Sequence, residues 1–277
     1  MKTLRGIGDR REEPPAIALN KPCMKVDDFD GDPKLTKIIP EKLAKHHGGA
    51  NAASIGANWA ETFEVHGGLS RDSVVLDIGC GPGRMAVGIG ERFDFRQPSY
   101  LGFDITKPDI DWCQQNITAA HPNFRFVHLD VKNAHYNPKG KIEPYDVQFP
   151  ASTGSSEFIF ATSVFTHMRT LELEVYLAES KRCLSKDGRI FATFFCLEEG
   201  FAGRMPEGRD FSTRIDAQCY TARPENPEDA IAYNKAYVLN SFERLGLKAD
   251  FFRGGWSGLT TRNGRHGQDY VVARHAE

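Results

Sequence analysis

From Asp72 onward, short apolar runs alternate with segments in which apolar residues recur at helical spacing. The apolar runs are rich in valine, isoleucine and phenylalanine, which suits strands buried on both faces of a sheet. Strands are predicted at 73–79, 99–105, 124–130, 157–165, 189–197, 247–253 and 268–274. Because helical segments separate most of these strands, the pattern predicts an α/β fold with a mostly parallel sheet and helices on both faces.

Helices are predicted at 83–92, 107–121, 171–184 and 226–245. Pro108 lies near the start of the second helix, and Pro227 takes the first position of the last, where a missing N–H does no harm. We expect Asp187-Gly188 to turn the chain into the strand at 189–197. Gly246 is expected to end the last helix.

Two long segments, 131–156 and 198–225, interrupt this alternation. Each follows the carboxyl end of a predicted strand, where parallel sheets place their ligand sites. Long loops in a compact domain are usually functional or disordered, so both segments are candidates for covering a site. Residues 1–66 are predicted to form an N-terminal arm with short helices, a candidate lid. Residues 67–277 are predicted to form the main domain, with the two segments as insertions.

Charge and composition narrow the possible partners. The 277 residues carry a formal net charge of −2 and show no basic stripe, which argues against nucleic acid or an anionic membrane as partner. The six cysteines form no C-x-x-C pair, which favours a reducing cytoplasm. The first residues lack the apolar stretch of a signal peptide, and no apolar run is long enough to span a bilayer. We therefore expect a cytoplasmic protein with a small-molecule partner. Its oligomeric state stays open, a homodimer included.

The run VVLDIGCGPGR, Val74–Arg84, joins a predicted strand to an acid and a glycine-rich turn. Two further acids, Asp104 and Asp130, end the next two predicted strands. Parallel sheets bind ligands at these ends, and glycines let a ligand approach the backbone. An acid after the second strand suits the two hydroxyls of a ribose. The combination predicts a cofactor that contains adenosine.

Two cofactors compete for this pattern. GPGRMA, Gly81–Ala86, matches the dinucleotide fingerprint G-x-G-x-x-G/A, and Asp104 lies at a suitable spacing for NAD. Against NAD, Asp77 would set a carboxylate close to a pyrophosphate, and Pro82 removes one N–H from the phosphate loop. A carboxylate instead suits the ammonium group of S-adenosylmethionine, which also carries a sulfonium. An NAD-dependent oxidoreductase is the less favoured alternative.

The same run resembles the first motif of the class I S-adenosylmethionine-dependent methyltransferases. YLGFDI resembles their second motif and FRFVHLD their third, while FIFATSVFTHM and YLAESKRCLSKDGRIFATFF resemble their fourth and fifth strands with the helix between. This likeness runs from about Val74 to Leu197. More loosely, the C-terminal tail resembles bacterial members that act on sugars or small hydroxylated metabolites. The resemblance implies a Rossmann-like, seven-stranded sheet whose last strand, 268–274, runs antiparallel to the rest.

The resemblance also implies which residues hold S-adenosylmethionine, with S-adenosylhomocysteine as the product. Asp77 would face the ammonium side, Asp104 the ribose hydroxyls, and Asp130 the adenine. The full set that it implies is Asp77, Gly79, Cys80, Gly81, Gly83, Arg84, Asp104, Ile105, Asp130, Val131, Thr162 and Ser163.

Transfer of a methyl group to a hydroxyl calls for a base, because an alcohol is a poor nucleophile while it keeps its proton. His167, just after the fourth predicted strand, is the candidate base; the alternative is a histidine that caps a turn. Candidates for contacting the acceptor are Arg169, Arg204, Tyr233 and Trp256. Some relatives hold a metal with glutamates near this histidine. Residues 163–167 contain no carboxylate, so no metal ligand is assigned.

The sequence thus predicts a methyltransferase that acts on a hydroxyl of a sugar or related small metabolite. Transfer to nitrogen or carbon, the oxidoreductase, and a non-catalytic binding module with the same fold are the alternatives. No N-P-P-Y/F-like tetrapeptide follows the fourth strand, which argues against modification of nucleic-acid bases.

Overall fold

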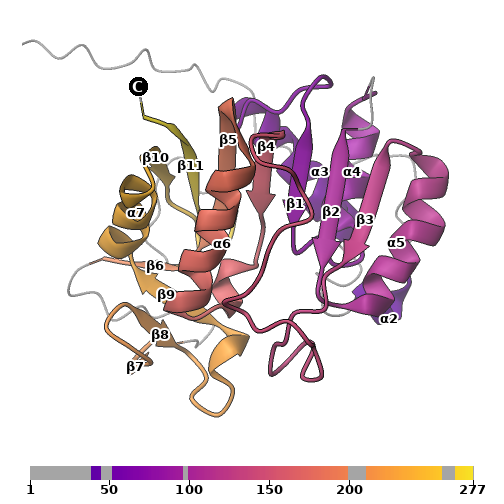
Figure 1. The fold of residues 1–277 in the computed structure, drawn as a ribbon. Coiled ribbons are helices and arrows are strands. Elements are labelled where there is room, and N and C mark those ends of the chain that lie inside the picture. Colours follow the sequence, from indigo (N-terminus) through magenta and orange to yellow (C-terminus); the bar gives the residue numbers. More distant parts are fainter. Residues whose placement is uncertain (1–38, 45–51, 96–98, 199–209, 258–265, 277) are drawn as a thin grey trace, which may run out of the picture. The chain divides into compact units, whose positions relative to one another are not determined.

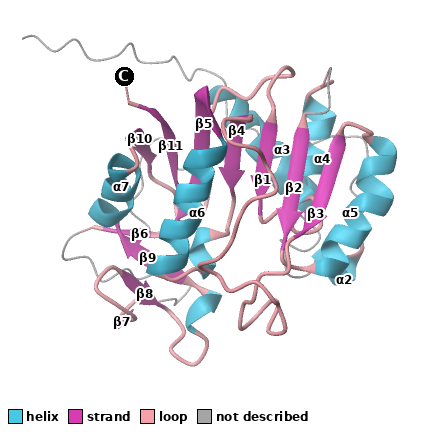
Figure 2. Cartoon of the chain, viewed as in Figure 1, coloured by secondary structure: helices cyan, strands magenta, loops and turns pink. Residues whose placement is uncertain are grey.

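The structure, a computed structural model, describes residues 39–44, 52–95, 99–198, 210–257 and 266–276. These residues fold around a seven-stranded sheet of order β10-β11-β5-β4-β1-β2-β3 (Figures 1 and 2). Its strands are β1 (Val75–Ile78), β2 (Tyr100–Asp104), β3 (Phe124–His128), β4 (Ser156–Ala161), β5 (Leu184–Phe194), β10 (Leu247–Phe252) and β11 (Asp269–His275). β11 runs antiparallel to both of its neighbours, and the other pairs are parallel. The predicted fold class is confirmed, including its antiparallel last strand.

Helices cover both faces of this sheet. α3 (Ala52–Val65), α4 (Arg84–Arg92) and α5 (Lys107–Ala120) lie on one face, α6 (Thr170–Cys183) and α7 (Lys235–Arg244) on the other. Neighbouring residues of β4 enter opposite cores: Phe158 and Phe160 pack against α3, and Ile159 lies in the core that α6 covers. Burying one such side chain stabilises the fold by about 1.5–3 kcal/mol. The central strands are therefore apolar on both faces.

The short helices predicted before residue 66 are α2 (Glu41–Ala44) and α3. Phe63 of α3 packs against both phenylalanines of β4, so α3 belongs to the core of the main sheet. Residues 1–38 lie outside the described residues, and the boundary at residue 66 and the lid stay predictions. Among the helices in the described ranges, none is long and apolar enough to cross a membrane.

A second, smaller sheet of order β6-β9-β8-β7 was not predicted. Its strands are β6 (Cys196–Leu197), β7 (Thr213–Arg214), β8 (Cys219–Thr221) and β9 (Ile231–Asn234). In Figure 1 it lies on the side of the main sheet toward which the arrowheads of β1 to β4 point. The second insertion therefore contributes two strands, β7 and β8, beside the carboxyl ends of the parallel strands.

The predicted helix at 226–245 is wrong in its first half. Pro227–Asp229 form one turn of 3-10 helix, Ile231–Asn234 form β9, and α7 starts only at Lys235. Ile231 and Tyr233 are fully buried, and the backbone of β9 pairs with β6 and β8. This tertiary pairing outweighs the helical spacing of the apolar residues, because propensity is a weak preference. Gly246 follows the end of α7 with φ 71°, as expected of a helix-terminating glycine.

The fifth strand also differs from the prediction. β5 starts at Leu184, directly after α6, and Asp187-Gly188 lie inside it instead of forming a turn before it. Leu184 pairs with Ser156 but Arg189 pairs with Phe158, so the residues between them form a bulge. The strand ends at Phe194, and the following Cys196–Leu197 pair with β9.

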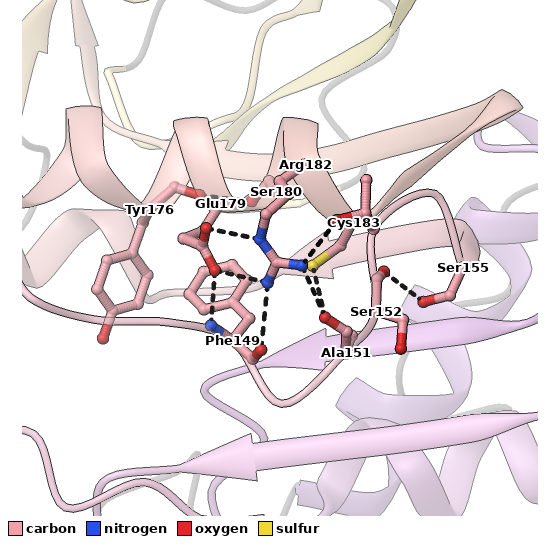
Figure 3. A network of polar contacts seen from close by, with 10 residues as sticks. Phe149, Ala151, Ser152, Ser155, Tyr176, Glu179, Ser180, Arg182 and Cys183 are labelled. Atoms are coloured by element: carbon pink, nitrogen blue, oxygen red, sulfur yellow. Dashed lines mark hydrogen bonds and ion pairs between the residues drawn. The ribbon is translucent and has the colours of Figure 1, made fainter.

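The end of the first insertion, 131–156, is fastened to α6 by the guanidinium of Arg182 (Figure 3). Arg182 donates to both carboxylate oxygens of Glu179, at 2.8 and 2.7 Å, and to the carbonyl oxygens of Ala151 and Phe149, at 2.9 and 3.2 Å. Glu179 in turn accepts the backbone N–H of Phe149 at 2.7 Å. Charge-assisted hydrogen bonds of this bidentate kind are among the stronger ones in proteins. The end of the first insertion is therefore held firmly against α6.

Candidate active site

A cavity of about 290 Å³ lies at the carboxyl ends of β1, β2 and β4. Its position agrees with the rule that parallel sheets bind ligands beyond these ends. Its lining combines residues that follow the strands with two residues of the first insertion and with Asp229, which follows the second. They are Gly79, Cys80, Arg84, Met85, Phe103, Asp104, Ile105, Thr106, Asn133, Tyr136, Thr162, Ser163, Val164, Thr166, His167, Met168, Tyr176, Phe195, Asp229 and Gln268.

The glycine-rich turn after β1 requires glycine at Gly79. This residue has φ 68°, and a Cβ added to it would lie 2.5 Å from Cγ2 of Val164. The N–H groups of Gly79 and Cys80 both donate to the carbonyl oxygen of Phe103, at 2.9 and 3.0 Å. Because the turn is held from β2 and has no side chain at Gly79, its backbone forms one wall of the cavity.

Asp104, at the end of β2, holds the same turn through its carboxylate. Oδ2 accepts the N–H of Gly81 and Oδ1 accepts the N–H of Thr106, each at 2.8 Å. Burial raises the pKa of Asp104, while these two backbone donors act in the opposite direction. The carboxylate lines the cavity, and each oxygen keeps a second lone pair for a ligand hydroxyl.

Asp77 is fully buried in β1 and does not line the cavity. The hydroxyl of Tyr100 donates a short hydrogen bond to Oδ2. Oδ1 has no hydrogen-bond partner in the part of the chain that the structure describes. Burial raises the pKa of Asp77 to about 8, whereas the Tyr100 hydrogen bond and the charge of Arg84 lower it. A buried carboxyl with one oxygen unbonded lowers the cost of placing a positive charge nearby.

The segment after β4 supplies the opposite wall. Ser163 has φ 58°, a left-handed conformation that is uncommon for a residue other than glycine. Its N–H donates to Oγ1 of Thr193 at 2.8 Å, and its hydroxyl contacts Oε1 of Gln268 at 3.1 Å. Two side chains, those of Thr193 in β5 and of Gln268 just before β11, therefore hold Ser163 at the cavity wall.

His167 ends a turn of 3-10 helix, Phe165–His167, and lines the cavity. Its Nδ1 lies 2.8 Å from the carbonyl oxygen of Glu228. A carbonyl oxygen only accepts, so Nδ1 carries the proton and Nε2 of the neutral ring is the basic nitrogen. The ring of Tyr136 stands edge-on to this imidazole, with centroids 5.7 Å apart.

Of the residues expected at the site, the structure brings eight to the cavity wall. They are Gly79, Cys80, Arg84, Asp104, Ile105, Thr162, Ser163 and His167. Five of the expected cofactor residues lie outside the lining: Asp77, Gly81, Gly83, Asp130 and Val131. Asp130 and Val131 instead organise the first insertion, where Nδ2 of Asn137 donates to Oδ1 of Asp130 and to the carbonyl oxygen of Val131, each at 3.0 Å.

Three residues expected to contact the acceptor also lie outside the lining. Each of them contacts a residue that lines the cavity or one that binds a lining residue. Arg169 pairs with Glu228 at 3.6 Å. The hydroxyl of Tyr233, which is fully buried, donates to the carbonyl oxygens of Phe165 and Met168 on either side of His167. Trp256 donates to Asp269 at 2.7 Å and packs edge-on against Phe195, a lining residue. Arg204 lies outside the described residues.

Sequence reasoning missed several polar residues of the lining, among them Asn133, Tyr136, Asp229 and Gln268. The first two lie in the segment 131–156, whose unusual length did mark it as a candidate cover. Asp229 was assigned to the first turn of a helix that does not form there. Nothing in the local pattern around Gln268 distinguishes it from the start of a strand. In the described ranges, no group of three or more histidine, cysteine or acidic residues has the arrangement of a metal site.

These features suit a ligand with an adenosine end and a positive charge. The turn at Gly79 lines the cavity with backbone that carries no side chain, and Asp104 presents a carboxylate to the cavity. The unbonded oxygen of Asp77 lies in the adjoining strand, where it favours a cation over a pyrophosphate. S-adenosylmethionine has both properties, and NAD lacks a matching charge for Asp77.

Comparisons with known proteins agree with this geometry. Residues 75–188 match the family model described as a methyltransferase domain. A carboxy-S-adenosyl-L-methionine synthase of Actinobacillus pleuropneumoniae serotype 3 is 25% identical over 121 residues, which are 41% of this chain and 48% of that protein. The chain thus spans about half the length of the curated relatives it matches.

Solved structures share the fold. The PH0226 protein of Pyrococcus horikoshii OT3 superposes with a TM-score of 0.54 at 14% identity, over 86% of this chain and 97% of that one. The CcbJ methyltransferase of Streptomyces caelestis superposes with a TM-score of 0.51 at 15% identity, over 80% and 90%. The fold, the cavity and the family match agree: residues 75–188 carry a methyltransferase domain, and its cofactor is S-adenosylmethionine.

Proposed function

We propose that the protein transfers the methyl group of S-adenosylmethionine to a hydroxyl of a sugar or related small metabolite, with His167 as the general base. The observation that carries this proposal is the hydrogen bond between Nδ1 of His167 and the carbonyl oxygen of Glu228, 2.8 Å long. It fixes the tautomer in which Nε2 accepts a proton, and it does so at the wall of the cavity.

Each part of the cavity has its own role in the proposed methyl transfer. When bound, S-adenosylmethionine would supply the methyl group from its sulfonium and would leave as the neutral thioether S-adenosylhomocysteine. The turn at Gly79 and the carboxylate of Asp104 hold the adenosine end, and the wall at Thr162–Ser163 holds the methionine end. His167 takes the hydroxyl proton on Nε2 as the acceptor oxygen attacks. The remaining task of the protein is alignment and exclusion of water, since the methyl group is already activated.

The first experiment is thermal unfolding with S-adenosylmethionine, S-adenosylhomocysteine and NAD, each added separately. A ligand at about 100 times its dissociation constant stabilises by about 2.7 kcal/mol, which raises the midpoint by a few degrees. We expect a shift with the two sulfur compounds and none with NAD. A shift with NAD alone would show that the protein is an oxidoreductase.

Methyl transfer from radiolabelled S-adenosylmethionine to a panel of sugars and cyclitols tests the role of His167. His167→Gln keeps a hydrogen-bonding side chain but removes the base, so kcat should fall about 10²- to 10⁴-fold. Affinity for S-adenosylhomocysteine, measured by calorimetry, should stay within about twofold, because the methyl acceptor and not the cofactor needs the base. An amine acceptor needs less help, so an unchanged kcat would favour transfer to nitrogen.

A reaction on the cofactor itself is the second candidate, because the curated relatives are named carboxy-S-adenosyl-L-methionine synthases. Mass spectrometry of the cofactor recovered after turnover separates the two. Conversion to S-adenosylhomocysteine supports methyl transfer, and a product heavier than S-adenosylmethionine supports the second candidate.

A further inference from the structure

The first insertion meets the turn at residues 226–229, which follows the second insertion, beside the cavity on the side of His167. Nδ2 of Asn133, in the first insertion, donates to Oε2 of Glu228 at 3.2 Å. Asn226 contacts the ring of His135 at 3.4 Å. Glu228 also provides the carbonyl oxygen that holds His167. The loops therefore brace each other and the candidate base through one residue, and they leave Tyr136 and Asp229 in the cavity wall.

Tyr136 presents an aromatic face in this wall. Its side chain is 38% exposed, and its ring lies edge-on to His167. Burial raises the pKa of Tyr136, and the charges of Asp229 and Asp104 raise it further. The hydroxyl thus lies in the field of both carboxylates that line the cavity. Nothing in the described part of the chain hydrogen-bonds this hydroxyl.

Asp229 contributes a carboxylate with one oxygen already engaged. Its Oδ2 accepts from Nε of Arg223 at 2.8 Å. Among the described residues, no hydrogen bond to Oδ1 is found. The arginine pair fixes the orientation of the carboxylate, so that a ligand gains a positioned acceptor without first having to order the side chain.

The charges on this side of the cavity argue against an anionic acceptor. Beyond the cofactor end, the described lining contains the carboxylate of Asp229 and the imidazole of His167, and no lysine or arginine. Arg169 and Arg223 lie outside the lining and are paired with Glu228 and Asp229. A phosphate or carboxylate here would lie beside the carboxylate of Asp229, and no lysine or arginine of the described lining on this side could bind it.

We propose that Tyr136 and Asp229 form the subsite for the acceptor, and that the acceptor is an uncharged, polyhydroxylated ring. One C–H face of the ring lies on the aromatic face of Tyr136, and a hydroxyl donates to Oδ1 of Asp229. A second hydroxyl then points at Nε2 of His167, which takes its proton as the methyl group is transferred. This inference rests on the proposed function and narrows its substrate class.

The test compares acceptors that differ only in charge. Probes are methyl glucoside and inositol, their phosphate esters, glucuronate and glucosamine, each offered with radiolabelled S-adenosylmethionine. We expect kcat/KM for a neutral probe to exceed that of its anionic counterpart about tenfold or more, since the carboxylate of Asp229 would repel each anion. Methylation confined to the anionic probes, or to the amine, would overturn the inference while the proposed function stands. If no probe is methylated although S-adenosylhomocysteine binds, both are overturned.

Two variants test the residues themselves on the best neutral probe. Tyr136→Ala and Asp229→Asn should each raise KM about tenfold or more, with kcat changed less and affinity for S-adenosylhomocysteine unchanged. The matched controls are Tyr145→Ala, an exposed tyrosine of the same insertion, and Glu225→Gln, an exposed acid near Asp229. Equal effects of a variant and its control on KM would show a structural role only, and would overturn the assignment.

Discussion

The two halves of the cavity are built in different ways. The cofactor half consists of turns that directly follow β1, β2 and β4, and its key contacts run through the backbone, as between Asp104 and the N–H of Gly81. The half proposed for the acceptor consists of Tyr136, from the first insertion, and of His167 and Asp229, from two turns of 3-10 helix. It is joined through the side chains of Asn133 and His167, which both bind Glu228. Backbone contacts tie one half to the sheet, whereas side-chain contacts leave the other half free to vary.

This difference implies that the halves respond separately to mutation. Changes in the strand-end turns should weaken cofactor binding and stability together, because the same contacts serve both. Changes in the insertions should alter the acceptor KM and leave the cofactor in place. Three substitutions test whether cofactor binding and acceptor binding respond separately.

Asp104→Ala should have the largest effect on the cofactor half. It removes the acceptor of two backbone N–H groups, those of Gly81 and Thr106, and the carboxylate offered to the ribose. We expect affinity for S-adenosylhomocysteine to fall about 100-fold, at about 1.5–3 kcal/mol for each charged hydrogen bond lost. Calorimetry measures the affinity, and the exposed Asp94→Ala serves as control. An unchanged affinity would mean that the cofactor does not lie against β2.

Arg182→Met should affect the acceptor half from a distance. It removes the guanidinium that holds Phe149, Ala151 and Glu179 (Figure 3). The free energy of unfolding should fall by about 2 kcal/mol, and the end of the first insertion should no longer be held against α6. Urea unfolding gives the stability, and KM for the acceptor should rise while affinity for S-adenosylhomocysteine holds. The matched control is the exposed Arg125→Met. A loss of cofactor affinity as large as the rise in KM would contradict the separation of the halves.

Asp77→Asn should have the smallest effect at neutral pH. It should change how the free energy of unfolding depends on pH. Burial raises the pKa of Asp77 from 3.8 to about 8, and the groups that face it are Tyr100, Arg84 and Asp104. A carboxyl with a higher pKa in the folded state binds its proton more tightly there. Its contribution to stability is therefore present at low pH and is lost as pH rises through about 8.

The free energy of unfolding of the natural protein should thus fall more steeply than that of Asp77→Asn between about pH 5 and pH 8. Urea unfolding at several pH values measures this slope. Asp187→Asn, at an exposed position of β5, should follow the natural protein. Parallel curves for all three proteins would show that Asp77 does not titrate in this range.

Prediction from the sequence succeeded where one segment determines its own structure. The run from Val74 to Arg84 indicated a strand, a glycine turn and a helix, and the structure has β1, the turn at Gly79 and α4. Ile110, Cys113 and Ile117 recur at helical spacing in the predicted helix 107–121, and all three are buried in α5. Prediction from the sequence failed at 226–234, where apolar residues at helical spacing form a 3-10 turn and β9.

The sequence by itself determined the order of strands and helices, the glycine turn and the acid that holds it, because each depends on local periodicity and on backbone angles that few residues adopt. The side chains that line the cavity around His167 depend on tertiary contacts. Tyr136, His167 and Asp229 are far apart in the chain, and they meet because β9 pairs with β6 and β8 and because Glu228 links the first insertion to His167. Such contacts join separate segments, and no local pattern encodes them.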